Sequence, residues 1–361
     1  MPLESGTKLG PYEIIAPIAA GGMGEVYRSR DTRLDRVVAI KVLPAHLADR
    51  VDLRERFERE ARAVSSLNHP HICTLYDVGE QDGIHFLVME YLEGETLADR
   101  LQRGPLPLDQ SLKCAIEIAD ALDKAHRQGV VHRDMKPGNI MLTKSGSKLL
   151  DFGLARLKPP GSGAAFTAAS VLPTEKSGLT MQGSILGTLH CMAPEQLEGK
   201  DADARTDIFA FGGVLYEMLA GRKAFEGRSQ ISVISAIMER EPAPISTLQA
   251  ATPPALDRVI RRCLAKDPDE RWQAASDLTA ELRWIAESEA QAGIAAPAPS
   301  LQRRTRSRLI LGWIVAAVFF LMSVTLGMAL YLGRARNDTR PFRFSVSAPE
   351  FSRIQKEPGL T

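Results

Sequence analysis

Two short polar strings in the middle of the chain constrain its fold and chemistry more than any other feature. Residues 132–139 read His-Arg-Asp-Met-Lys-Pro-Gly-Asn, and residues 151–153 read Asp-Phe-Gly. Phosphoryl transfer needs a carboxylate that orients the attacking hydroxyl, and an amide and a second carboxylate that hold magnesium on the triphosphate. Asp134, Asn139 and Asp151 have the types and the order that these roles require. Either string alone is an ordinary charged loop or turn, so the prediction depends on finding both.

A glycine-rich segment near the start supplies a second part. Residues 19–27 read Ala-Ala-Gly-Gly-Met-Gly-Glu-Val-Tyr and lie between apolar stretches at 12–18 and 37–43. Glycine lets the backbone approach phosphates closely and present its amides to them. A dinucleotide-binding domain would follow its glycines with a helix, whereas residues 25–30 have strand character, so a nucleotide-binding hairpin is favoured. The candidate phosphate contacts in this hairpin are Gly21, Gly22 and Gly24.

A lysine and a glutamate form the next candidate pair. Lys41 ends the apolar string Val-Ala-Ile-Lys, where its ammonium would neutralise the α- and β-phosphates. Residues 53–67 have apolar side chains at helical spacing, which predicts a helix that carries Glu60. We expect a Lys41–Glu60 ion pair when this helix swings in, so that the pair is both part of the site and a switch. Most glutamates on such helices are merely solvated, and Glu60 is chosen by its register.

Three further strings extend the pattern: Met-Ala-Pro-Glu at 192–195, Asp-Ile-Phe-Ala-Phe-Gly at 207–212 and Asp-Pro-Asp-Glu-Arg-Trp at 267–272. With them, residues 9–285 resemble the eukaryotic-like (Hanks-type) Ser/Thr protein kinases, and the chain is similar to bacterial single-pass receptor kinases. The resemblance implies an α+β, two-lobed fold with a β-rich N-lobe and a larger helical C-lobe. The implied bounds are 9–89 for the N-lobe, 90–92 for the hinge and 93–285 for the C-lobe.

The resemblance also assigns roles to single residues. It makes Asp134 the base, Lys136 a contact of the γ-phosphate, and Asn139 and Asp151 the ligands of Mg²⁺ beside ATP. A lysine two positions after the aspartate is typical of the Ser/Thr branch, in which Thr188 would reach back to both residues. Three more residues have structural roles by resemblance: Glu195 and Arg271 as a buried pair that braces the C-lobe, and Asp207 as a brace for the catalytic loop.

The adenine pocket follows from the same resemblance. The hinge would hold adenine with Glu90 and Leu92, and Met89 resembles the residue that closes the back of the pocket. The apolar faces around the base would be Val26, Ala39 and Met141. A methionine or valine in an apolar run is more often plain core, so these assignments depend on the alignment.

Two departures from the family pattern keep a second function open. Ala19 stands where the first glycine of the hairpin is usual, and Cys191 and Gln182 stand where a tyrosine and a second threonine are common. A pseudokinase scaffold that recruits partners to the membrane is therefore the alternative. Its only support is Ala19 and Cys191, because the residues that carry the chemistry are intact.

The segment from Asp151 to Glu195 is long, and its middle, 159–178, is rich in Gly, Ala, Ser and Thr. Kinases with an arginine before the catalytic aspartate, here Arg133, are typically regulated by a phosphate that this arginine grips. Autophosphorylation in trans is the expected activating step. The candidate phosphorylation sites are Thr180, which aligns best, and Thr174, Ser177 and Ser184.

The composition agrees with a soluble enzyme domain to which a further segment is attached. The net charge is +1 and 25% of residues are charged, so no nucleic-acid footprint is visible. The four cysteines lack metal or redox spacing, which fits a reducing compartment. The expected partners are proteins with Ser or Thr hydroxyls, the membrane and a second copy of the chain.

The C-terminal part has a different character. A flexible linker is expected at 286–308, then a membrane span at 309–332, which contains no charged residue, and a short tail at 333–361 outside the membrane. About 24 residues at ~1.5 Å each reach ~36 Å, enough for hydrocarbon ~30 Å thick. Arginines flank both ends equally, so the cytoplasmic placement of the kinase domain at the cell membrane depends on the absence of a signal peptide.

Small residues on one face of the span suggest dimerisation. They are Gly312, Ala316, Ser323 and Gly327. A receptor that senses a ligand outside the cell is a third possibility, limited by the short tail.

Overall fold

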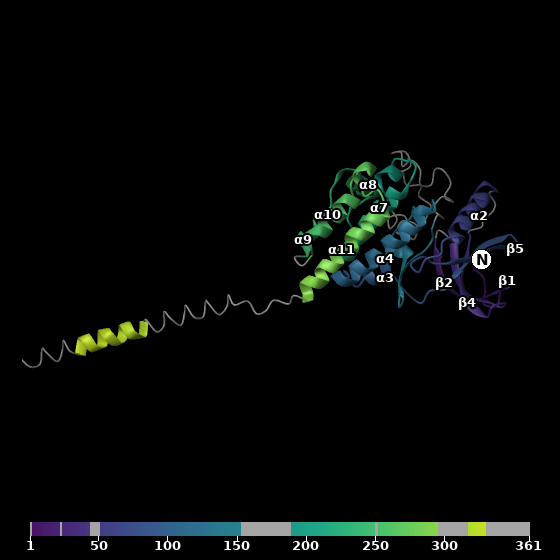
Figure 1. The fold of residues 1–361 in the computed structure, drawn as a ribbon. Coiled ribbons are helices and arrows are strands. Elements are labelled where there is room, and N and C mark those ends of the chain that lie inside the picture. Colours follow the sequence, from purple (N-terminus) through teal and green to yellow (C-terminus); the bar gives the residue numbers. More distant parts are fainter. Residues whose placement is uncertain are drawn as a thin grey trace, which may run out of the picture. The chain divides into compact units, whose positions relative to one another are not determined.

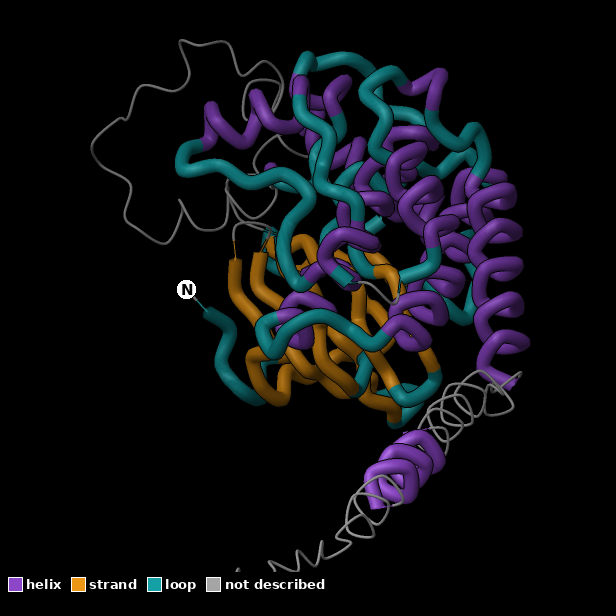
Figure 2. The backbone as a smooth tube through the Cα atoms, turned by 90° about the vertical axis from the view of Figure 1, so that its left-hand side faces the viewer, coloured by secondary structure: helices purple, strands orange, loops and turns teal. Residues whose placement is uncertain are grey.

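The computed structural model describes residues 2–21, 24–43, 51–152, 189–249, 252–294 and 317–329, with the backbone alone at 21, 51–57, 290 and 292–294. The chain divides into two compact units, Met1–Ile294 and Ala295–Thr361, which are described separately (Figure 1). Figure 2 shows that strands and helices of the first unit occupy different regions.

The N-lobe is built on an antiparallel six-stranded sheet. Its strands follow the order β1-β2-β3-β4-β6-β5. Their bounds are β1 Lys8–Leu9, β2 Tyr12–Gly21, β3 Gly24–Asp31, β4 Arg36–Val42, β5 Leu75–Gln81 and β6 Ile84–Glu90. Side chains alternate between faces along a strand, so Val38 and Ile40 of β4 enter the core with Tyr27 while Lys41 lies on the opposite face. The sheet thereby holds Lys41 on the face that carries Ala39.

One helix covers part of this sheet. Helix α2 (Val51–Ser65) contacts β5, and its Ala61 is buried against Leu75 and Leu87. This confirms the helix predicted at 53–67, which begins and ends two residues earlier than expected. Glu60 therefore lies in the last turns of α2, next to the apolar contact that fixes the helix on the sheet.

The C-lobe is helical. Its helices are α3 Leu97–Leu101, α4 Leu108–Arg127, α6 Pro194–Leu197, α7 Ala204–Ala220, α8 Gln230–Glu239, α9 Ile245–Leu248, α10 Pro254–Cys263 and α11 Ala275–Ile294, with short 3₁₀ turns η1 Pro137–Asn139 and η4 Pro268–Glu270. A small sheet, β7 Gly94–Thr96, β8 Ile140–Thr143 and β9 Gly146–Leu149, lies beside them. The β-rich N-lobe and helical C-lobe confirm the predicted two-lobed, α+β architecture.

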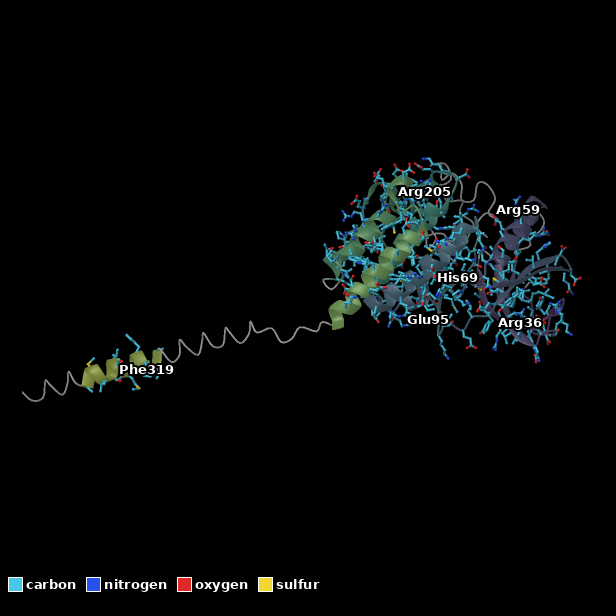
Figure 3. The ribbon with its side chains drawn as sticks, viewed as in Figure 1. Arg36, Arg59, His69, Glu95, Arg205 and Phe319 are labelled. Carbon is cyan, nitrogen blue, oxygen red and sulfur yellow. The ribbon has the colours of Figure 1, made fainter. Side chains whose placement is uncertain are left out.

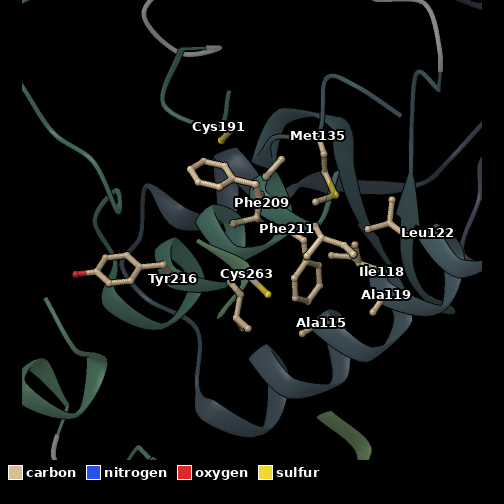
Figure 4. Packing of buried hydrophobic residues seen from close by; sticks show 14 of the residues in the cluster. Ala115, Ile118, Ala119, Leu122, Met135, Cys191, Phe209, Phe211, Tyr216 and Cys263 are labelled. Carbon is tan, nitrogen blue, oxygen red and sulfur yellow. The ribbon is translucent and has the colours of Figure 1, made fainter. Parts of the chain in front are cut away.

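The centre of the C-lobe is α7, whose side chains are buried on nearly all sides. Gly212 permits this packing, because a Cβ added there would lie 2.5 Å from Cys263 Cβ of α10. Figure 4 shows Phe211 of α7 with Ile118 and Leu122 of α4 in the same apolar cluster. Arg36 at the start of β4 and Arg205 in the first turn of α7 mark the two lobes in Figure 3. The core thus supplies rigid helices on which a site can be mounted.

The second unit is described only as a helix over residues 317–329. Its large apolar side chains, among them Phe319 (Figure 3), are exposed. None of the helices in the described ranges is both long and apolar enough to cross a membrane. The linker predicted at 286–308 begins too early, because α11 continues as a helix to Ile294. The rest of the linker, the remainder of the predicted span and the tail at 333–361 lie outside the described residues.

The C-lobe contains a buried amine without a hydrogen-bond acceptor among the described residues. Lys266 Nζ lies 4.2 Å from the ring centroid of Phe225, and no described residue accepts a hydrogen bond from it. Burial lowers the pKa of Lys266 to about 8. Below this pH the folded protein carries a buried ammonium. Between pH 8 and 10.5 the unfolded chain binds a proton that the folded protein has released, so the contribution of Lys266 to stability rises with pH.

We therefore expect Lys266→Met to raise the melting temperature at pH 7 and to flatten its rise between pH 8 and 10. Circular dichroism melts of the full chain at several pH values measure both effects. Lys144→Met is the control, because Lys144 is exposed in a turn. A lower melting temperature for Lys266→Met at pH 7 would show that the ammonium–ring contact outweighs the cost of burial.

Candidate active site

A buried carboxylate holds the loop that carries the candidate base. Asp207, in the first turn of α7, accepts hydrogen bonds from the backbone N–H of His132 and of Arg133, each at 2.7 Å. His126 Nε2 of α4 lies 2.8 Å from Asp207 Oδ2. The structure confirms that Asp207 braces this loop. His126 was not predicted, and only its place at the end of a helix before the loop could have indicated it.

Two other predicted site residues come together around Asp134. Lys136 Nζ lies 2.8 Å from Asp134 Oδ2, and Asn139 Nδ2 donates to the Asp134 backbone oxygen at 2.8 Å. Met135, which lies between Asp134 and Lys136 in the sequence, is buried in the apolar cluster of Figure 4 and anchors the loop to the core. No described residue donates to Asp134 Oδ1, which leaves this oxygen for a hydroxyl donor.

Asn139 and Asp151 offer oxygen atoms to a cation. Asn139 uses its amide nitrogen for Asp134, and its Oδ1 has no donor among the described residues. The backbone N–H of Leu150 donates to the Asn139 backbone oxygen at 2.9 Å, so Asp151 follows directly beside it. Mg²⁺ prefers carboxylate and amide oxygens over nitrogen. The donor set therefore fits the magnesium that the sequence predicts.

The ion pairs differ from the predicted ones. Lys41 is buried, and its Nζ lies 2.8 Å from Asp151 Oδ1. Glu60 Oε1 lies 3.9 Å from a guanidinium nitrogen of Arg133. Lys41 and Glu60 do not pair with each other in the described part of the chain. A buried ammonium needs a carboxylate, and the one that this arrangement brings to Lys41 is Asp151.

The predicted adenine residues lie on neighbouring strands. Ala39 is paired with Met89 across β4 and β6, and Val26 is paired with Lys41 across β3 and β4. Met141, in β8, is half-buried. Val26, Ala39 and Lys41 thus lie on adjacent strands of one sheet, whereas Met141 belongs to the other sheet, and their contact with adenine stays a prediction.

The hinge begins where β6 ends. The Glu90 backbone N–H donates to Thr74 O at 2.9 Å, and its carboxylate pairs with Lys148 Nζ at 2.8 Å. Neither the N–H nor the C=O of Leu92 is paired with a described residue. The backbone of Leu92 therefore has the hydrogen-bonding capacity that a bound base needs, while the side chain of Glu90 is used to tie the lobes together.

A small cavity of about 20 Å³ lies between α2, the sheet and the Asp-Phe-Gly string. Its lining residues are Ala61, Val64, Cys73, Leu75, Leu87, Met89, Asp151 and Phe152. Burial raises the pKa of the Cys73 thiol to about 12. The cavity is mostly apolar, and one of its walls is Met89, which resembles the residue at the back of the adenine pocket.

The described strands of the glycine hairpin accommodate Ala19. Gly21 is paired with Gly24 at the end of the β2–β3 ladder, and Gly24 has φ +113°, a conformation that favours glycine. Ala19 is paired with Val26 inside the ladder and has no positive φ. Alanine at position 19 is therefore unstrained. Gly22 lies outside the described residues.

The predicted brace of the C-lobe is present. Two guanidinium nitrogens of Arg271 donate to the two carboxylate oxygens of Glu195, each at 2.8 Å. Thr206 Oγ1 donates to Glu195 Oε1 at 2.7 Å. Arg271 is fully buried, and its remaining N–H groups donate to backbone carbonyls of Ala265, Arg205 and Lys266. The structure confirms this buried pair.

Several predicted residues lie outside the described part of the chain. They are Thr174, Ser177, Thr180, Ser184 and Thr188, together with Gln182. Cys191, just after this segment, is buried, and burial raises the pKa of its thiol to about 12. Cys191 is therefore a packing residue here.

The arrangement has counterparts among known proteins. The family model described as "Protein kinase domain" matches residues 12–282, so the chain belongs to the protein kinase family. The relatives point to its eukaryotic-like serine/threonine branch. The chain is 34% identical over 362 residues to serine/threonine-protein kinase PknB of Mycolicibacterium smegmatis and 38% identical over 276 residues to PrkC of Bacillus subtilis.

The two alignments cover 90% and 76% of this chain, but only 56% of PknB and 40% of PrkC. The chain thus spans about half, or less, of the length of these relatives. Among solved structures, the kinase domain of Mycobacterium tuberculosis PknI is similar, with a TM-score of 0.60 and 27% identity. That alignment covers 79% of this chain and 99% of the PknI chain.

Proposed function

We propose that this chain is a membrane-anchored protein kinase that transfers the γ-phosphate of ATP to serine and threonine hydroxyls of proteins. The observation that carries the proposal is the cluster of Asp134, Lys136 and Asn139 on a loop that Asp207 holds through two backbone hydrogen bonds. Protein kinases use ATP with Mg²⁺. The cluster has the oxygen donors and the ammonium groups that this chemistry needs.

Each residue has a distinct task in the proposed reaction. Asp134 Oδ1 accepts a hydrogen bond from the substrate hydroxyl and orients its oxygen toward the phosphorus. Asp151 and Asn139 Oδ1 would hold Mg²⁺, which neutralises charge on the triphosphate. Lys136 stabilises the negative charge on the transferred group, and Lys41 releases Asp151 to bind the α- and β-phosphates. Lys136, two residues after Asp134, supports serine and threonine as the acceptors.

Anchoring in the cell membrane through residues 309–332 is supported by the described part of this segment. Four consecutive apolar residues, Val318 to Leu321, are exposed, so apolar side chains surround the helix. A helix that is apolar on all sides belongs in a protein core or a membrane. The PknB alignment also covers more of the chain than the kinase domain alone. The kinase domain is cytoplasmic in this proposal, and the small-residue face of the span supports a homodimer.

Activation by phosphate on the segment before Glu195 completes the proposal. Arg133, which lies near Glu60, would bind a phosphothreonine at position 180 or at one of the alternative sites 174, 177 and 184. Glu60 would then be released to Lys41. Transfer between two copies of the chain in the same membrane would supply this phosphate in trans.

The test combines catalysis and anchoring. Membranes that contain the full chain are fused with polyethylene glycol to membranes that contain a Lys41→Met chain of different size, and are given labelled ATP. We expect the Lys41→Met chain to gain phosphate within residues 174–184 only when the unchanged chain is present. A folded chain that incorporates no phosphate would favour the pseudokinase scaffold.

Anchoring is read in the same samples by carbonate extraction. The full chain should stay in the membrane pellet, whereas Leu321→Arg with Val324→Arg should move into the supernatant, because each charge at a bilayer centre costs about 2.5–3.5 kcal/mol. Extraction of the unchanged chain would contradict the membrane anchor and leave the kinase activity unaffected.

A further inference from the structure

Arg133 has an unusual backbone conformation next to the candidate base. Its φ is +66°, in the left-handed region that non-glycine residues rarely adopt. Such a conformation is strained and persists only where its surroundings hold it. Other residues must therefore hold the backbone N–H and C=O groups of Arg133 in place.

Both backbone polar groups of Arg133 are bound by side chains. Its N–H donates to Asp207 Oδ1 at 2.7 Å, and its C=O accepts from Gln196 Nε2 at 2.9 Å. These two groups flank the φ and ψ bonds of Arg133, so the pair of hydrogen bonds sets both angles. The C=O of Arg133 also belongs to the peptide bond that leads into Asp134.

Gln196 is itself held in place. It follows Glu195 in α6, the helix that Glu195 ties to Arg271. Its Oε1 accepts from the Ala193 N–H at 3.0 Å, which orients the amide so that Nε2 faces Arg133. The Gln196 side chain thus connects α6, at the end of the segment between Asp151 and Glu195, to the catalytic loop.

We propose that Gln196 is a positioning residue for the transfer reaction. It acts by donating a hydrogen bond to the Arg133 carbonyl, which keeps the Arg133 backbone in its left-handed conformation. The inference rests on the proposed function in one respect, namely that Asp134 is the base. Through Gln196, the position of α6 determines the direction of the Asp134 carboxylate and of the Arg133 side chain. Residue 196 was not predicted, and its only sequence signal is that it directly follows the Ala-Pro-Glu string.

Gln196→Glu tests this role in the full chain in detergent. The new carboxylate accepts from Ala193 as before, but it turns an oxygen toward the Arg133 carbonyl where a donor is required. Gln273→Glu is the matched control, because Gln273 Nε2 also donates to backbone carbonyls, those of Pro268, Asp269 and Arg271, on an exposed turn.

We expect Gln196→Glu to lower kcat by about 10- to 100-fold, the size of effect that small misplacements of a reacting group produce. KM for ATP should stay within about twofold, because the residues proposed to hold ATP are not bonded to Gln196. Gln273→Glu should change neither constant. A kcat for Gln196→Glu within about twofold of the unchanged chain would overturn the proposal, and so would an equal loss in both variants.

Amide hydrogen exchange gives a readout that does not depend on activity. The peptide that covers residues 130–136 should exchange faster in Gln196→Glu than in the unchanged chain and in Gln273→Glu. Unchanged exchange would refute the positioning role even if activity fell. Faster exchange in a chain that shows no transferase activity at all would instead confirm that Gln196 holds the Arg133 backbone, and it would refute the proposed function.

Discussion

Asp134→Asn is expected to lower phosphate transfer by about 10²- to 10⁴-fold, the usual contribution of a general base. Asparagine keeps the size of the side chain and leaves one oxygen for Lys136 or Asn139. It places an amide group where Oδ1 would accept the hydroxyl hydrogen, so the substrate oxygen loses its orientation. Transfer from labelled ATP to a generic basic protein substrate measures the loss.

The control for Asp134→Asn is Asp123→Asn. Asp123 lies on α4 and forms an i,i+4 pair with Arg127 at 2.9 Å, away from the site. Such pairs contribute about 0.3–0.5 kcal/mol, so this variant should keep its activity. More than a tenth of the original rate in a folded Asp134→Asn chain would show that another group orients the hydroxyl.

Glu195→Ala is expected to have the largest effect on stability. It leaves the guanidinium of Arg271 buried without its carboxylate, which costs about 3–5 kcal/mol. Chemical denaturation of the full chain, followed by tryptophan fluorescence, measures the change. Glu198→Ala is the control, because Glu198 is exposed and its one ion-pair partner among the described residues is the exposed Lys200. Its effect should stay below about 1 kcal/mol.

A double variant separates the value of the pair from the penalty of breaking it. Glu195→Met with Arg271→Met removes both charges and keeps apolar volume, so it should cost less than Glu195→Ala alone. A double variant that is less stable than Glu195→Ala would mean that the backbone carbonyls bound by Arg271, rather than Glu195, carry most of the stabilisation.

The same pair predicts a dependence of stability on acid. Burial alone would raise the pKa of Glu195, but hydrogen bonds from Arg271 and Thr206 outweigh it and lower the pKa below the ordinary 4.5. A carboxylate with a lowered pKa stabilises the fold above its unfolded-state pKa, and this contribution is lost as the pH falls through the folded-state value. The difference in stability between the unchanged chain and Glu195→Gln should therefore shrink below pH 4.5.

The sequence motifs were sufficient to predict the residues whose positions are set by a single helix or turn. Asp207, Glu195 and Arg271 are each set by the register of a short string on a buried helix or turn, and the structure has them where the strings predict. The partner of Lys41 was not predictable in this way. Its choice between Asp151 and Glu60 depends on where α2 lies against the sheet, and no local pattern encodes that position.

Gln196 and His126 show a second limit. Both are ordinary polar residues on helices, and their importance comes from contacts with backbone groups or a carboxylate distant in sequence. The importance of the hydrogen bond from Gln196 becomes clear only when the left-handed φ of Arg133 is known. Motif reasoning finds the residues that touch a substrate more readily than those that hold them.

The buried cysteines have a consequence for chemical biology. Cys114 and Cys191 are buried, and burial raises the pKa of both thiols, like that of Cys73, to about 12; burial raises the pKa of Cys263 as well. Alkylating agents and peroxides attack the thiolate, so these four side chains should react slowly while the protein is folded. Electrophilic inhibitors would find no ready nucleophile among them. A single cysteine introduced on the surface could then carry a fluorophore or spin label without removal of the native ones.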